Sequence, residues 1–311
     1  MRIAFLGTPE IGAIVLQDLL ESGLKIEAVI TQPDRPCGRG CKLQESAVKK
    51  VASASRLKIF QPANKVELTQ AIKGIKPDLC IVAAYGMMIP NEALSTPKYG
   101  MINFHPSLLP ELRGPSPIPM AIMCGHAKTG VTIIQISEKM DAGDILAQEV
   151  YELTGKETTP GLSADLAQVG SKMLLETIIK IADGAIDPKK QDEKGATFSP
   201  IIKKSDGEVL FKKYHAQNIE QAARAFTPWP GIFTTWKGKK LNLFDIFVQR
   251  TDLCKASPLS AGRVALCDDK IAIGTKKGTI LVGSLQLEGK KRQTAKEFVC
   301  GHPDFINSIL G

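Results

Sequence analysis

The stretch RIAFLGTPEIGAIVLQDLLESGLKIEAVIT, residues Arg2–Thr31, decides the fold of this 311-residue chain. It opens with an apolar run at Arg2–Leu6, continues with a helical pattern at Pro9–Ser22 and ends with a second apolar run at Ile26–Thr31. Gly23 follows the helical pattern at the position where a left-handed cap is common. A strand, a helix and a strand in this order predict a βαβ unit with parallel strands.

The same alternation continues through the first half of the chain. It predicts further strands at Leu79–Ala84, Gly100–His105, Gly130–Ile136 and Ile145–Val150, and further helices at Glu45–Ala54, Val66–Gly74, Pro117–Met123 and Ser163–Ala182. We therefore expect an α/β fold, with a Rossmann-like, mostly parallel sheet and helices on both of its faces.

The last third of the chain has a different pattern. A polar stretch without periodicity, residues 185–206, predicts a linker. A helix at Ala216–Ala225 and short β runs between residues 233 and 286 follow it. Several short strands with glycine turns predict a small OB-like β-barrel. The expected organisation is a catalytic domain at 1–184, the linker, and a second domain at 207–311.

Charge is concentrated in that second domain. Residues 206–311 contain 16 Lys and Arg against 10 Asp and Glu, which accounts for most of the net charge of +8. A basic domain beside a nearly neutral one favours a polyanionic partner such as nucleic acid. The alternative is a solvated, lysine-rich surface without a partner.

Composition excludes several classes of protein. Hydrophobic residues make up 43% of the chain, typical of a globular protein, and no apolar run approaches the roughly 20 residues that span a membrane. The seven cysteines are scattered and are interpreted as reduced thiols. We expect a cytoplasmic monomer that does not bind membranes.

The strongest local signal is the pair Asn103 and His105 at the end of a predicted strand. Two residues apart on a strand, their side chains leave the same face, at the edge where open α/β sheets bind ligands. Asp141 follows the next long strand, and in a doubly wound sheet it can reach the same crevice. A carboxylate beside an imidazole holds its tautomer and can accept a proton.

These residue types indicate direct acyl transfer. An amide and an imidazolium suit an oxyanion that forms when an amine attacks a carbonyl carbon, and Asp141 suits the proton that the amine loses. Four histidines without helical pairing do not predict a metal site, and the nucleophile pattern G-x-S-x-G is absent. The first glycine turn, at Gly7–Gly12, lacks the second glycine of a dinucleotide site.

Three segments together resemble the folate-dependent formyltransferases. They are Asn103–Pro110 (NFHPSLLP), Leu112–Gly114 (LRG) and Met140–Asp144 (MDAGD). The resemblance implies catalytic roles for Asn103, His105 and Asp141, and 10-formyltetrahydrofolate as the co-substrate without a metal. It also implies that the loop lies on the folate site, through Ser107, Leu108, Leu109 and Pro110.

Other segments are similar to those of methionyl-tRNA formyltransferases, namely Gln32–Lys42, Ala225–Gly231 and Leu285–Lys291. This likeness implies methionyl initiator tRNA as the formyl acceptor, with the acceptor stem contacted by Arg35, Arg39 and Lys42. Cys37 and Cys41 depart from the pattern of that loop. Further candidates for the tRNA face are Lys237, Lys239, Lys240, Lys290, Lys291 and Arg292.

Three alternatives remain open at this point. Two are enzymes of the same superfamily: a formyltransferase that acts on an amino-sugar nucleotide, and the hydrolase that releases formate from the same folate. The third is an RNA-binding protein on an inactive formyltransferase scaffold. The basic loop and the basic last third argue against a sugar-nucleotide enzyme, and the intact Asn103, His105 and Asp141 argue against an inactive scaffold.

Overall fold

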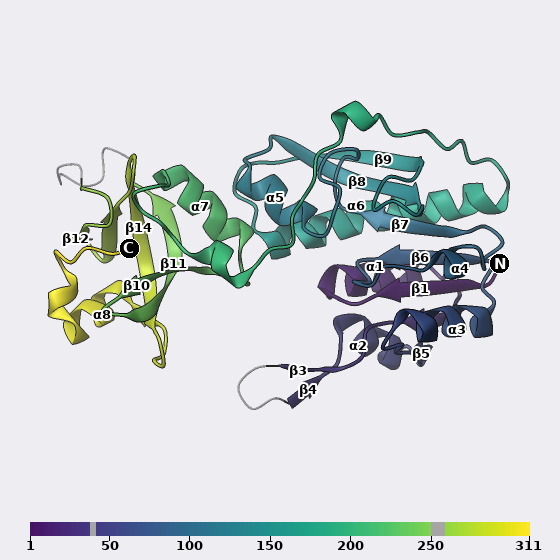
Figure 1. Cartoon of the computed structure of the whole chain (residues 1–311), viewed down its shortest axis with the longest axis horizontal. Helices are drawn as coiled ribbons and strands as arrows, with labels where there is room; N and C mark the ends of the chain where they lie inside the picture. Colours follow the sequence, from purple (N-terminus) through teal and green to yellow (C-terminus); the bar gives the residue numbers. More distant parts are fainter. Residues whose placement is uncertain (38–41, 250–258) are drawn as a thin grey trace. The chain divides into compact units, whose positions relative to one another are not determined.

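The computed structural model describes residues 1–37, 42–249 and 259–311, which form two compact units (Figure 1). Unit 1 consists of Met1–Ile118, Ala127–Thr154 and Gly161–Ile201, and unit 2 consists of Pro119–His126, Gly155–Pro160 and Ile202–Gly311. No helix in the described part of the chain is long and apolar enough to cross a membrane.

Unit 1 is built on a seven-stranded sheet with the order β5-β2-β1-β6-β7-β8-β9. The strands are β1 (Ile3–Gly7), β2 (Ile26–Ile30), β5 (Lys58–Phe60), β6 (Leu79–Ala83), β7 (Met101–His105), β8 (Lys128–Gln135) and β9 (Ile145–Glu152). The first five strands in this order pair in parallel, whereas β8 is antiparallel to both β7 and β9. The mostly parallel α/β sheet that the sequence predicts is thereby confirmed.

Helices cover both faces of this sheet. They are α1 (Glu10–Glu21), α2 (Ala47–Ala54), α3 (Lys65–Ile75), α4 (Asn91–Leu94), α5 (Pro117–Met123) and α6 (Thr159–Ala182), of which α5 and α6 each begin or end in unit 2. On one face, Leu68 and Ile72 of α3 pack with Leu6 and Val82 of the sheet. On the other, Gly170 of α6 lies against Phe104 of β7, whose side chain points away from that of Asn103.

Local sequence explains why these elements form where they do. All five residues of β1 are buried, as expected for a central strand covered on both sides. Helix α3 buries Leu68, Ile72 and Ile75, which recur at helical spacing. Its first turn is capped by Asn64, whose side chain accepts hydrogen bonds from the backbone amides of residues 66 and 67.

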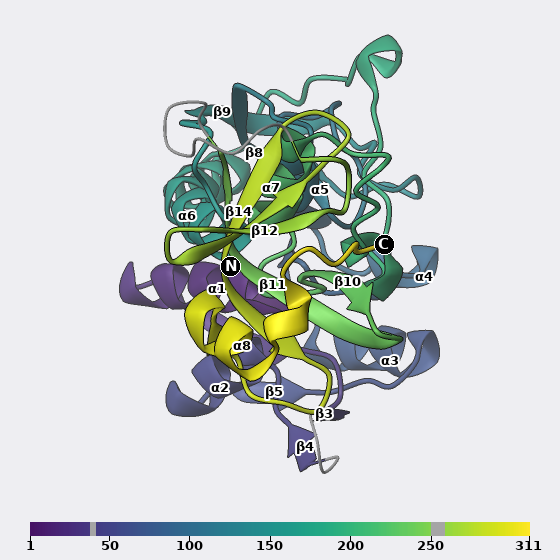
Figure 2. The same cartoon turned by 90° about the vertical axis from the view of Figure 1, so that its left-hand side faces the viewer.

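Unit 2 contains an antiparallel sheet with the order β10-β11-β14-β13-β12, and β15 pairs with β14. Its elements are α7 (Ala216–Ala225), β10 (Ile232–Trp236), β11 (Lys239–Val248), β12 (Val264–Cys267), β13 (Lys270–Gly274), β14 (Thr279–Leu287), β15 (Gln293–Thr294) and α8 (Ala295–Gly301). Figure 2 faces this unit, with α8 against the sheet. Trp236 and Phe298 pack there with ring centroids 5.9 Å apart.

Several elements differ from the sequence expectations. The strand β5 and the hairpin of β3 (Arg35–Cys37) and β4 (Lys42–Gln44) were not predicted, because segments of three residues carry no usable periodicity. Cys267 is disulfide-bonded, so the expectation that every cysteine is a reduced thiol is wrong at this position. Cys80, Cys124 and Cys300 are free thiols.

The segment predicted as a linker, 185–206, has regular structure in two places. Two short 3-10 helices, η1 (Glu193–Gly195) and η2 (Lys204–Gly207), begin within this segment. A third 3-10 helix, η3 (Pro303–Phe305), lies outside it, near the end of the chain. Residues up to Ile201 belong to unit 1. Much of the segment therefore packs with the larger unit.

The contact between α6 and the sheet predicts the effect of Gly170→Ala. A methyl group at this position would lie 2.3 Å from the Phe104 ring and 2.8 Å from Val131. Overpacking of this kind costs about 1–3 kcal/mol, so the free energy of unfolding in a urea titration should fall by that order. Gly74→Ala on α3, where no atom lies within 4 Å of the added methyl group, is the control. It should be neutral or stabilising by less than about 1 kcal/mol, and equal effects of both variants would contradict the packing argument.

Candidate active site

Strand β7 carries two polar side chains at its carboxyl end. Asn103 is partly buried and His105 is 4% exposed, and both leave the same face of the sheet. Because β6 and β7 are parallel, this end of β7 lies at the edge where the carboxyl ends of the parallel strands meet. The sequence prediction for this pair is consistent with that placement.

Asp141 reaches the pair by a different route from the one we expected. Strand β8 is antiparallel to β7, so its carboxyl end lies beside Met101, at the beginning of β7. The loop 137–144 must therefore fold back along the face of the sheet toward Asn103. Asp141 takes a left-handed conformation in this loop, with φ of 51°.

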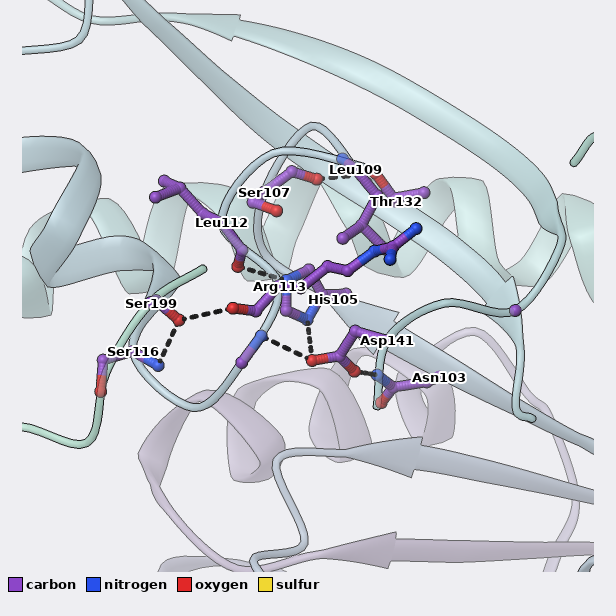
Figure 3. A network of polar contacts seen from close by, with 12 residues as sticks. Asn103, His105, Ser107, Leu109, Leu112, Arg113, Ser116, Thr132, Asp141 and Ser199 are labelled. Atoms are coloured by element: carbon purple, nitrogen blue, oxygen red, sulfur yellow. Dashed lines mark hydrogen bonds and ion pairs between the residues drawn. The ribbon is translucent and has the colours of Figure 1, made fainter. Parts of the chain in front are cut away.

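The three side chains meet at one place (Figure 3). The Asn103 Nδ2 donates to Asp141 Oδ1 at 3.3 Å, and His105 Nδ1 lies 3.7 Å from Asp141 Oδ2. The backbone N–H of Gly114 donates to the same Oδ2 at 2.8 Å. The loop after β7 and the loop after β8 are thus joined through one carboxylate.

The surroundings of His105 determine which ring nitrogen carries the proton. Its Nε2 lies 3.1 Å from the carbonyl oxygen of Leu112, which can only accept, so Nε2–H is the donor. Burial lowers the pKa of the imidazole below its usual range, although the charge of Asp141 and the Leu112 carbonyl oppose the shift. Burial therefore favours the uncharged ring, in which the Nδ1 that faces Asp141 carries no proton.

This arrangement combines a hydrogen-bond donor with a pair of proton acceptors. One N–H of the Asn103 amide is directed at Asp141, which leaves the second for another acceptor. Asp141 and the Nδ1 of His105 can share one incoming proton. Attack by an amine on a carbonyl carbon needs a donor that polarises the carbonyl group and a base that accepts the proton of the amine, and this arrangement has both.

A cavity of about 130 Å³ adjoins Asn103 and Asp141. Its other lining residues are mostly apolar, and they are Val82, Met87, Met88, Ile89, Ile134, Ile136, Ser137, Lys139 and Met140. Sequence reasoning missed these residues. A signal was present, because residues 84–89 follow β6, and the strand order reverses between β1 and β6, where open α/β sheets bind ligands.

The four residues predicted to contact folate do not line this cavity. Ser107 and Leu109 are 1% and 3% exposed, and Leu108 and Pro110 are partly exposed. The Ser107 hydroxyl donates to the Glu111 carbonyl at 2.6 Å, and the Leu109 amide donates to Thr132 at 3.1 Å. These bonds brace the loop that carries Leu112 and Gly114 to the site, and the folate contacts stay a prediction.

Two of the three predicted tRNA-contacting residues, Arg35 and Lys42, lie in a hairpin of unit 1. Arg35 is exposed on β3 and donates to the Gln32 side chain at 3.3 Å, and Lys42 begins β4. Arg39 lies outside the described residues. The base of the hairpin is held by Asp34, which accepts from Lys49 at 2.6 Å and from Gln61 at 2.8 Å.

Some of the predicted basic residues of unit 2 have partners within the unit. Lys237 pairs with Asp304, and Arg292 pairs with Asp245 at 2.5 Å. Lys240 lies over the ring of Phe233, with Nζ 3.7 Å from the centroid, and burial lowers its pKa. Among the residues that the structure describes, no group of three or more His, Cys, Asp or Glu side chains could hold a metal ion.

Comparison with known protein families matches two parts of the chain. Residues 1–178 match the formyl transferase family model, and residues 201–303 match the model of the formyl transferase C-terminal domain. Methionyl-tRNA formyltransferases from Desulfotalea psychrophila and Bacillus subtilis are 40% and 38% identical to this chain. Each alignment covers the whole of this chain, together with 95% of the Desulfotalea protein and 98% of the Bacillus protein.

Solved structures share the fold at lower identity. HypX from Aquifex aeolicus, solved in complex with tetrahydrofolic acid, superposes with a TM-score of 0.67 at 19% sequence identity. The superposition covers 99% of this chain and 48% of the HypX chain. The sugar 3N-formyl transferase WlaRD gives 0.65 at 17% identity, over 94% of this chain and 99% of its own. With both family models matched and relatives this similar along its whole length, the chain belongs to the formyl transferases, within the family of methionyl-tRNA formyltransferases.

Proposed function

We propose that the protein transfers a formyl group from 10-formyltetrahydrofolate to the α-amino group of methionyl initiator tRNA. The observation that carries the proposal is the meeting of Asn103, His105 and Asp141 beside an apolar cavity, in a chain of this family. The cavity next to the three side chains would receive the folate. Its methionines can adapt to a flat aromatic ring system.

In this proposal, Asn103 stabilises the charge that develops during attack. 10-Formyltetrahydrofolate supplies the formyl carbon, which the methionyl amine attacks. The free N–H of the Asn103 amide donates to the formyl oxygen as it becomes an oxyanion. A donor in a comparable acyl-transfer site contributes about 3–4 kcal/mol to lowering the barrier.

Asp141 and His105 handle the proton that the amine loses. The attacking nitrogen becomes acidic as its bond to carbon forms, and the Asp141 carboxylate lies within reach of the same space. The bare Nδ1 of His105 can take the proton from Asp141, and the imidazolium then donates from Nδ1. His105 thus acts as a base first, and as a donor to the oxyanion only once it is protonated. The same proton can leave with the folate nitrogen when its bond to the formyl carbon breaks.

The tRNA is proposed to be bound through charge. Arg35 begins β3 and Lys42 begins β4, with Arg39 between them in the sequence, and such residues suit phosphates of an acceptor stem. Unit 2, which carries most of the net positive charge, would contact the backbone elsewhere. The proposal places the protein in the cytoplasm together with the translation machinery.

A direct assay tests this function against its alternatives. Incubation with 10-formyltetrahydrofolate and charged initiator tRNA should give formylmethionyl-tRNA and tetrahydrofolate in equal amounts. An amino-sugar nucleotide should not accept the formyl group, and formate should not be released when tRNA is omitted. Tetrahydrofolate production without formylmethionine would favour the hydrolase, and no turnover with any acceptor would favour an RNA-binding role.

The proposed roles of Asn103 and Asp141 predict a loss of turnover without a loss of folate binding. Asn103→Ala removes the oxyanion donor, and Asp141→Asn removes the proton acceptor, so each should lower kcat by about 100-fold or more. Folate affinity, measured by calorimetry, should change by less than about threefold, because both variants leave the apolar lining of the cavity in place. Asp144→Asn, in the same loop, is the control and should keep near wild-type kcat. Unchanged turnover in both site variants would remove the assignment.

The proposed role of the hairpin predicts a salt-dependent binding defect. Arg35→Ala removes one exposed cation, so tRNA affinity should fall. The plot of log K against log salt concentration should become less steep, by roughly the contribution of one phosphate contact. Lys25→Ala, an exposed cation outside the hairpin, removes the same charge and should leave the slope unchanged. Identical slopes for Arg35→Ala and the wild type would exclude a phosphate contact at Arg35.

A further inference from the structure

A segment outside the recognised motifs contacts both loops of the active site. Residues 189–199, here called the strap, are all part of unit 1. At one end, Lys189 exchanges two backbone hydrogen bonds with Ile145 at the start of β9, at 2.7 and 2.8 Å. At the other, Thr197 accepts from the backbone amides of Leu112 at 2.8 Å and Arg113 at 2.9 Å.

Gln191 is the residue of the strap that joins the two loops. Its Nε2 donates to the carbonyl oxygen of Asp141 at 2.8 Å and to that of Gly143 at 2.7 Å. Its Oε1 accepts from Arg113, at 3.0 Å from Nε and 2.8 Å from Nη2. Two donated and two accepted bonds use the full hydrogen-bonding capacity of the amide. The geometry leaves this side chain one orientation.

The loop that Gln191 holds is strained. Asp141 has a φ of 51°, a left-handed conformation that costs free energy for residues other than glycine, although less for aspartate than for most. Two residues later the backbone passes so close to β8 that a methyl group on Gly143 would lie 1.7 Å from the Gln135 carbonyl oxygen. The bonds from Gln191 fall on the carbonyl groups at both of these positions, Asp141 and Gly143.

The same side chain also contacts the loop after β7. Arg113, bound to the Oε1 of Gln191, immediately precedes Gly114, whose amide donates to the Asp141 carboxylate. Arg113 is 3% exposed, and its second partner, Glu193, is mostly exposed. The two loops are therefore linked twice, once through Gln191 and once through the hydrogen bond from Gly114 to Asp141.

We propose that Gln191 is a positioning residue, which holds the Asp141 carboxylate in register with Asn103 and His105 by binding the backbone of its loop. The kinetic consequence rests on the proposed function. The position of the carboxylate can be tested independently of that function, because the Gly114 amide donates to the carboxylate and reports on its position without substrate.

Gln191→Glu separates the two sides of the bridge. Glutamate keeps the acceptor for Arg113, but it replaces the amide N–H groups with an oxygen that faces two carbonyl oxygens. We expect kcat to fall about tenfold or more, while the KM for folate stays within about twofold, and the melting temperature stays close to that of the wild type. Glu193→Ala is the matched control, because it removes the other partner of Arg113 and leaves the bonds to Asp141 and Gly143 in place. It should keep near wild-type kcat.

Amide hydrogen exchange supplies the readout that needs no reaction. In Gln191→Glu the Gly114 amide should exchange about tenfold faster or more, because the carboxylate that accepts its hydrogen bond moves. The Ser199 amide, which donates to the Arg113 carbonyl at 2.7 Å, should keep its protection. Gln191→Met, which adds no charge but removes both the amide donors and the acceptor for Arg113, is the second variant if the glutamate variant does not fold.

The outcomes distinguish this inference from the proposed function. Faster exchange at Gly114 alone, with lower kcat, supports the positioning role. Wild-type kcat, or unchanged exchange at Gly114, overturns it, and so does equal loss of protection at Gly114 and Ser199, which would indicate general destabilisation. If the wild type transfers no formyl group, the proposed function fails, and the exchange data still decide whether Gln191 positions Asp141.

Discussion

The carboxylate of Asp141 is the group on which the arrangement of the site depends. It accepts a hydrogen bond from the Gly114 amide at 2.8 Å, and it faces Asn103 and His105 with its two oxygens. A carboxylate with a side chain only 15% exposed is costly unless such contacts replace water. The bonds that satisfy this acid are also the bonds that hold two loops together, so local stability and the geometry of the candidate site rest on the same atoms.

Burial determines what His105 can do beside that acid. A ring in a low-dielectric setting resists protonation, and the Leu112 carbonyl holds its proton on Nε2. The nitrogen that faces Asp141 is therefore an acceptor in the resting protein. Because the carboxylate and the imidazole together can hold one proton, the pair is suited to take a proton from an attacking amine and to return it when the leaving group departs.

Much of the fold could be predicted from sequence because its elements are long and periodic. Helix α5 begins and ends where the pattern predicts, and so does α7. The missed strands, β3, β4, β5 and β15, have three residues or fewer, too few for a period of two to be recognised. Helix α8 was missed although its capping box is visible in the sequence, where Thr294 is followed three residues later by Glu297.

The sequence by itself determined the fold class and the family, and it predicted the three polar residues that the structure brings together, because strand ends and local motifs are encoded within a few neighbouring residues. Only the tertiary structure decided how Asp141 arrives. Its strand, β8, runs antiparallel to β7, so the loop has to fold back over the sheet instead of emerging at the shared edge. Only the tertiary structure placed Gln191 under that loop and set the tautomer of His105, since each depends on hydrogen bonds whose partners are separated along the chain and whose directions no local pattern contains.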